Sequence, residues 1–175
     1  VYKEINAIFD GSADRKILDK YQRVIPTLTL MRELFDKLVK NEAARGGLDL
    51  SSTESKIILD ADGRAVDIQP RTGGVSEDMI EQFMLLANQS AASFGLEHEL
   101  PFLFRIHDTP SAEKIEGLEE SLSEIGFDIS ELQKGVTPMA LSHILHRARD
   151  SRYALIVNNS ILRSMAKARY SENNI

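Results

Sequence analysis

The sequence contains no cysteine, and it lacks any apolar run as long as a membrane-spanning helix. The absence of cysteine excludes disulfides and thiolate metal sites. No signal peptide is recognisable at the start, so we expect a cytoplasmic protein with no membrane contact. The nucleotide-binding and hydrolase patterns GxGxxG, Walker A, GxSxG and HExxH are also missing. The residues by themselves therefore give no complete catalytic constellation.

Basic residues are outnumbered by acidic ones, 21 to 27, and the resulting net charge of -6 argues against a non-specific nucleic-acid binder. The charge is unevenly distributed, because acids dominate between Glu97 and Glu131 and bases dominate after Leu141. The basic side chains at this end are Arg147, Arg149, Arg152, Arg163, Lys167 and Arg169. Two interpretations remain open for them, a surface that faces phosphates and an ordinary solvated helix surface.

The periodicity of the 175 residues predicts an α+β fold in which helices predominate. Helices are expected at 2–9, 13–44 with a break or kink at Pro26, 75–94, 111–125 with Ser111 as the N-cap, 138–147 and 152–170. The apolar stripe of the second includes Leu30 and Leu34, and the apolar face of the last consists of Ile156, Ile161, Leu162 and Met165. A turn at 10–12 separates the first two helices. Gly46 or Gly47 is expected to end the second with a left-handed cap. The run 56–69 predicts a β-hairpin with its turn at 60–63, and 101–107 predicts a buried strand.

The helix expected at Val75–Phe94 is the element around which the chain is organised. Its apolar positions cover most of the circumference, so it is predicted to be buried on several sides, with Ser76 as the N-cap. Glu81 and Asn88 are the polar exceptions. A buried carboxylate needs a partner, so Glu81 forms either a structural salt bridge or a polar contact to a ligand. The sequence leaves both possibilities open.

The histidines and turn aspartates give weak metal signals. His143 and His146 are three residues apart on a predicted helix, a spacing that can bind zinc, but no third ligand is indicated nearby. His107, at the end of the predicted strand, is interpreted as a structural histidine. Asp60 and Asp62 are interpreted as turn formers and not as a metal pair.

Six segments, in order, resemble the middle of the catalytic domain of the ribonuclease II / ribonuclease R family of 3′→5′ exoribonucleases. They are YKEINAIFDG, ARGGLDL, KIILDADGRAVDI, MIEQFMLLAN, LFRIHDTPSAEKI and LRSMAKARYSENNI, which begin at residues 2, 44, 56, 79, 103 and 162. Each is weak alone, but their order and intervals agree with the family. Gly46-Gly47 and FRIHDTP are more similar to the ribonuclease R branch.

The resemblance implies roles for individual residues. Tyr2 matches the tyrosine that stacks on the 3′-terminal nucleotide, and Glu81 matches the glutamate that hydrogen-bonds ribose hydroxyls and distinguishes RNA from DNA. Leu50 occupies the position of a phenylalanine that clamps the last stacked base, although leucine has no aromatic face. Arg45 lies in the matching Arg-Gly motif, where it is expected to form a helix cap or a phosphate contact.

The resemblance also implies that parts of the family's machinery lie outside residues 1–175. Its Mg²⁺-binding aspartates would precede Val1, its Ser-Pro-Ile-Arg-Arg segment would follow Ile175, and its OB-type domains would lie elsewhere. We therefore expect a single partial domain of a processive, Mg²⁺-dependent exoribonuclease that degrades single-stranded RNA to nucleoside 5′-monophosphates. The chain alone is expected to be inactive.

Two other interpretations remain. One is a non-catalytic RNA-binding or protein-interaction module. The other is an unrelated helical scaffold, in which Tyr2 and Glu81 would not face a common groove.

Overall fold

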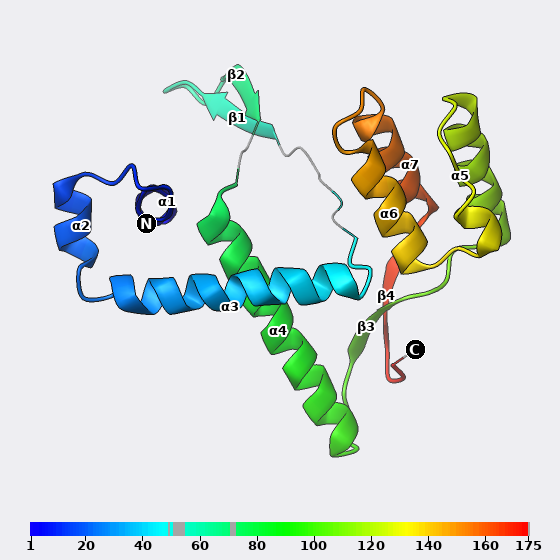
Figure 1. Cartoon of the computed structure of the whole chain (residues 1–175), viewed down its shortest axis with the longest axis horizontal. Helices are drawn as coiled ribbons and strands as arrows, with labels where there is room; N and C mark the ends of the chain where they lie inside the picture. The colour runs from blue at the N-terminus through cyan, green and yellow to red at the C-terminus, as the bar shows by residue number, and fades with distance from the viewer. Residues whose placement is uncertain (49, 51–54, 71–72, 175) are drawn as a thin grey trace. The chain divides into compact units, whose positions relative to one another are not determined.

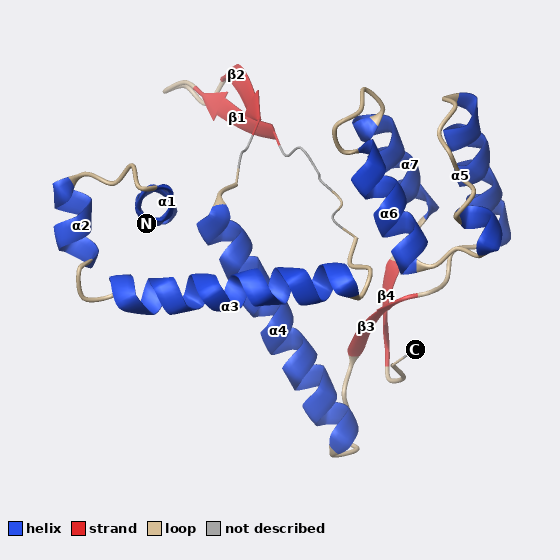
Figure 2. Cartoon of the chain, viewed as in Figure 1, coloured by secondary structure: helices blue, strands red, loops and turns tan. Residues whose placement is uncertain are grey.

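The computed structural model describes residues 1–48, 50, 55–70 and 73–174. The chain divides into two compact units, unit 1 with Val1–Val39 and Ser52–Asn88, and unit 2 with Lys40–Ser51 and Gln89–Ile175. Helices predominate and the strands form small antiparallel sheets, which confirms the predicted α+β class (Figure 2). Within the described ranges, no helix combines the length and the apolar character that crossing a membrane requires.

Unit 1 begins with three helices, α1 (Tyr2–Asp10), α2 (Arg15–Tyr21) and the start of α3 (Ile25–Ala44) (Figure 1). The predicted turn after α1 is confirmed, because Gly11 has a left-handed φ of 79°. The interruption expected at Pro26 lies earlier, at residues 22–24. Pro26 instead lies in the first turn of α3, where its missing N–H removes no helical hydrogen bond. The apolar stripe of α3 includes exposed residues, with Leu30 65% and Leu34 43% exposed.

The predicted hairpin of unit 1 is confirmed. Strand β1 (Ser55–Leu59) pairs antiparallel with β2 (Ala65–Pro70), and Ile57 lies opposite Ile68. The Asp60 carboxylate accepts the backbone N–H groups of Asp62 and Arg64 at 2.9 and 2.8 Å. Asp60 is therefore the turn former that the sequence predicts.

Helix α4 (Val75–Glu97) confirms the predicted central helix, but the predicted burial is wrong. Ser76 and Met79 in its first turns are buried at 2% exposure each. Further along, Glu81 and Asn88 are exposed, as is Phe94 at 55%. A helix that is apolar on most of its circumference needs packing partners on several sides. The described residues bury Ser76, Met79 and Gly95 and leave most of its other positions exposed.

The sheet of unit 2 shows one wrong prediction. Strand β3 (Phe104–His107) covers only the second half of the predicted strand, with Phe104 and Ile106 buried. It pairs antiparallel with β4 (Ala168–Ser171), a segment predicted to continue the last helix to Tyr170. That helix, α7, spans Ala154–Ser164 instead. Residues 168–171 are extended because β3, distant in sequence, supplies their hydrogen-bond partners.

Three helices enclose the core of unit 2: α5 (Ala112–Glu124), α6 (Pro138–Ala148) and α7, with the short 3₁₀ helix η1 (Leu132–Lys134) beside them. The predicted N-cap is confirmed, because Ser111 accepts the N–H of Lys114 at 3.4 Å. The core residues are Leu118, Leu122, Leu132, Ala140, Leu141, Ile144, Ala148, Val157 and Ile161. On α7, Ile161 is buried as predicted, whereas Ile156 and Leu162 are about half exposed at 46% and 50%.

Candidate nucleic-acid interface

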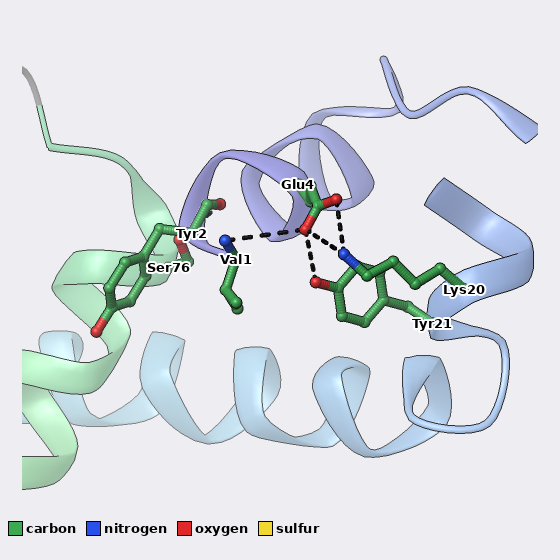
Figure 3. A network of polar contacts seen from close by, with 6 residues as sticks. All are labelled: Val1, Tyr2, Glu4, Lys20, Tyr21 and Ser76. Carbon is green, nitrogen blue, oxygen red and sulfur yellow. Dashed lines mark hydrogen bonds and ion pairs between the residues drawn. The ribbon is translucent and has the colours of Figure 1, made fainter. Parts of the chain in front are cut away.

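Tyr2 lies in the first turn of α1, where its side chain is 47% exposed. Figure 3 shows its ring beside the first turn of α4. The Tyr2 carbonyl lies 3.2 Å from the Ser76 hydroxyl, whose single proton can go either to this carbonyl or to the Glu77 carboxylate at 2.9 Å. An exposed aromatic face at this position is available for stacking.

Asn6 joins α1 to the start of α4. Its amide nitrogen donates to the Glu77 carboxylate at 2.9 Å, and its amide oxygen accepts the backbone N–H of Ser76 at 2.8 Å. The Asn6 hydrogen bond is the main cause that lowers the pKa of Glu77; donors from Ser76 and Gly74 add to it and desolvation opposes it. Glu77 is therefore a carboxylate at neutral pH and is held by several donors.

Glu4 points away from α4 toward α2 (Figure 3). Its carboxylate accepts hydrogen bonds from Lys20 Nζ at 2.9 Å and from the Tyr21 hydroxyl at 2.7 Å. These two hydrogen bonds, the one from Lys20 first, lower the pKa of Glu4. The contacts connect α2 to the helix that carries Tyr2.

Glu81 is exposed, contrary to the predicted burial. It follows Glu77 by four residues, so it lies on the same face of α4, about 6 Å further along the helix axis. Within the described ranges its carboxylate has no ion pair, which removes the structural salt bridge as an explanation there. The carboxylate is accessible to a ligand.

A hollow of about 520 Å³ lies beside α1 and the start of α4 in unit 1. Its lining includes Asn6, Arg32 and Glu77, but neither Tyr2 nor Glu81. The structure thus brings the helices of Tyr2 and Glu81 into contact without placing both side chains in this hollow.

The other two predicted contacts lie in unit 2. Arg45 is exposed just after the end of α3, and Gly46, with a φ of 79°, takes the left-handed position of the cap. Leu50 is partly buried and packs against the core of unit 2. Its side chain therefore has a structural contact here.

The described residues do not fit a metal site. They contain no group of three or more histidine, aspartate or glutamate side chains placed to hold an ion. His143 Nδ1 lies 3.1 Å from the Glu131 carboxylate, and His107 Nδ1 lies 3.0 Å from the Ala166 carbonyl, which agrees with a structural role for His107.

Part of the basic C-terminal region has structural partners. Arg169 donates to Asp108 at 2.6 and 2.9 Å, and Arg147 donates to the Asp128 carboxylate at 2.9 Å. For these two arginines, the structure favours the ordinary surface interpretation over the phosphate-facing one.

Sequence reasoning missed the contacts of Asn6, Ser76 and Glu77. Asn6 is 70 and 71 residues distant from its partners, and an asparagine within an amphipathic helix has no pattern that indicates such a contact. Ser76 was predicted to be the N-cap, but it lies inside the first turn of α4, because the helix begins at Val75.

A family model and several known proteins match this chain along nearly its whole length. The family model of the RNB domain matches residues 1–175. Ribonuclease R 1 of Lactococcus lactis is 32% identical over 173 residues, and Ribonuclease R of Thermotoga maritima is 31% identical over 175 residues. These alignments cover 99% and 100% of this chain but 21% and 24% of the relatives, so the chain spans less than a quarter of their length.

Solved structures agree. The apo form of Mycoplasma genitalium RNase R has a TM-score of 0.84 at 25% sequence identity, covering 98% of this chain and 26% of that one. The same enzyme in complex with ribose-methylated single-stranded RNA has a TM-score of 0.85 at 25% identity, covering 99% of this chain and 27% of that one.

Proposed function

This chain belongs to the RNB domain family, and from that premise we propose that it is the middle part of the catalytic domain of a processive 3′→5′ exoribonuclease. The enzyme hydrolyses RNA to nucleoside 5′-monophosphates. Ribonuclease R relatives that align along nearly the whole chain support an exoribonuclease. Because the chain spans only 21% and 24% of the first two relatives, the activity is proposed for the longer protein of which it is a part.

The observation that carries the proposal is the exposed carboxylate of Glu81, one helical turn beyond the contact between α1 and α4. In this proposal Glu81 accepts a hydrogen bond from the 2′-hydroxyl, the group that distinguishes RNA from DNA. Tyr2, exposed in the first turn of α1, stacks on the 3′-terminal base. Both residues bind and orient the RNA end.

We propose single-stranded RNA as the partner. Mycoplasma genitalium RNase R, which shares this fold, has been solved with ribose-methylated single-stranded RNA and with double-stranded RNA. Arg45 is an exposed cation suited to a phosphate. Leu50 has no aromatic face and packs against the core of unit 2, so we expect little base stacking from this residue.

Hydrolysis requires groups that the described residues do not supply. No cluster of ligands among them fits Mg²⁺. The proposal therefore assigns the metal to residues outside this chain. When bound, Mg²⁺ would activate water and stabilise the leaving oxygen. We propose on this basis that the 175-residue chain alone is inactive.

The test compares the chain alone with the full-length protein that contains it, each incubated with Mg²⁺ and 5′-labelled single-stranded RNA. We expect the full-length protein to convert the labelled RNA to a short 5′ product without accumulating intermediate lengths, as processive degradation from the 3′ end requires, and to release nucleoside 5′-monophosphates that chromatography detects. We expect no degradation by the chain. Robust degradation by the chain would contradict the assignment of the metal. RNA binding by the full-length protein without hydrolysis would favour the non-catalytic RNA-binding module.

A further inference from the structure

The start of α4 lacks a capping side chain of its own. The helix begins at Val75, so Gly74 occupies the N-cap position. A serine, threonine, aspartate or asparagine there would accept an N–H of the first turn through its side chain. Glycine has no such group, although the first N–H groups of a helix need acceptors.

Asn6 of α1 supplies the missing acceptor. Its amide oxygen takes the N–H of Ser76, the second residue of α4, at 2.8 Å. Glu77, the third residue, reaches back to the N–H of Gly74 at 3.2 Å, which is one half of a capping box. The cap is thus divided between two helices that are far apart in sequence.

Gly74 leaves room for this arrangement. A Cβ atom added at Gly74 would lie 2.2 Å from the Asn6 amide nitrogen, closer than such atoms can approach. A Cβ added at the neighbouring Gly73 would meet only the Asp78 carboxylate, at an ordinary 3.7 Å. The Asn6 side chain can therefore occupy its place only if residue 74 is glycine, whereas an alanine at residue 73 would not disturb it.

The divided cap lies between the two proposed RNA contacts. Tyr2 precedes Asn6 by four residues on α1, and Glu81 follows Glu77 by four residues on α4, so each contact lies one turn from the hydrogen bond between Asn6 and Glu77 on the same helix face. The Ser76 hydroxyl near the Tyr2 carbonyl adds a further link.

We propose that Asn6 is a positioning residue that caps α4 from α1 and thereby fixes Tyr2 relative to Glu81. The inference rests on the proposed function, in which these two side chains hold the terminal nucleotide. Asn6 does not touch the RNA; it sets the geometry in which Glu81 meets the ribose.

The test uses the full-length protein and measures the ratio of kcat/KM for an all-RNA oligonucleotide to that for the same oligonucleotide with a 2′-deoxy 3′-terminal nucleotide. Asn6→Ala and Gly74→Ala should each lower this ratio toward the value measured for Glu81→Ala, because an uncapped α4 no longer holds Glu81 in place against the ribose. The double variant Asn6→Ala/Glu81→Ala should be no less selective than Glu81→Ala alone, because both changes act on one contact.

The controls are Gly73→Ala and Asn159→Ala, the latter at an exposed asparagine of α7 in unit 2, and both should keep the wild-type ratio. Gly74→Ala displaces the Asn6 side chain without replacing it. This variant therefore tests the proposal even if Asn6→Ala does not fold. A reduced ratio for Glu81→Ala with a wild-type ratio for Asn6→Ala or Gly74→Ala would overturn this inference alone. A wild-type ratio for Glu81→Ala would overturn the ribose contact, and the positioning role with it.

Discussion

At the scale of single residues, Asp128 is an exposed carboxylate whose ionised form is stabilised by hydrogen bonds. It accepts the backbone N–H of Ser130 at 3.0 Å and a hydrogen bond from Arg147 at 2.9 Å. The Ser130 backbone hydrogen bond, and after it Arg147, lower the pKa of Asp128 to about 2. The ionised form is favoured in the folded state, so the pair contributes stability only where Asp128 is charged.

This linkage predicts a pH dependence of stability. An unfolded aspartate has a pKa of about 3.9, so the contribution of Asp128 is fully present above that pH and is lost as the pH falls toward about 2. Asp128→Asn should therefore lower the free energy of unfolding at pH 6, and its difference from wild type should shrink toward pH 2. Urea denaturation across this range measures the effect.

The control is Asp150→Asn, at an exposed aspartate that follows α6. It should show a smaller difference from wild type at pH 6. A difference for Asp128→Asn that is the same at pH 6 and pH 2 would show that the charge of Asp128 does not stabilise the fold.

At the scale of elements, helix ends determine how neighbouring segments meet. Gly46 ends α3 with a φ of 79°, and a Cβ atom there would lie 2.9 Å from the backbone nitrogen of Met139 in α6. Gly126 follows α5 with a similar φ of 69° and has nothing within 4 Å of its added Cβ. The backbone conformation alone requires glycine at Gly126, whereas Gly46 also allows a close approach of two backbones.

Replacing Gly46 or Gly126 by alanine is therefore expected to lower the free energy of unfolding by different amounts. Gly126→Ala should destabilise the fold by about 1–2 kcal/mol, the cost of a left-handed conformation for a residue with a Cβ. Gly46→Ala should cost more, because the backbone of α6 must also move. Free energies of unfolding from urea titrations of the two variants test this, and equal losses would show that the approach of α6 is not needed for stability.

The elements also show where sequence patterns were sufficient. The hairpin at 55–70 and the start of α5 at Ser111 were predicted correctly, because turn aspartates and N-cap serines act within a few residues. Residues 168–171 were predicted as helix, but they form β4 through pairing with β3. The capping of α4 by Asn6 likewise depends on a residue that is distant in sequence, so the local pattern did not predict it.

At the scale of the whole molecule, many large apolar side chains are exposed. On α3, Leu30 is 65% and Leu34 is 43% exposed, and on α4 Met84 is 56% exposed. Exposed apolar side chains, where they adjoin one another, mark sites that meet other protein segments. In the proposed longer enzyme, the rest of the domain would cover it.

We therefore expect the isolated chain to bind the dye ANS and to associate as its concentration rises. The double change Leu30→Lys/Leu34→Lys should reduce dye binding and association, with a change in unfolding free energy within about 0.5 kcal/mol per site, as is usual for exposed positions. Thr27→Lys, at an exposed site on the same helix, controls for added charge. Dye fluorescence and sedimentation velocity measure both effects, and wild-type dye binding by the double variant would contradict the assignment of this surface.

The sequence by itself determined the helical periods, the hairpin, most helix starts and the family, because these depend on short-range spacing and on ordered motifs. The tertiary structure decided that Glu81 is exposed, that Ser76 lies inside a helix capped from α1, and that residues 168–171 are a strand. The physical reason is that burial, capping and strand pairing depend on which distant groups reach a residue, and local periodicity does not specify those groups.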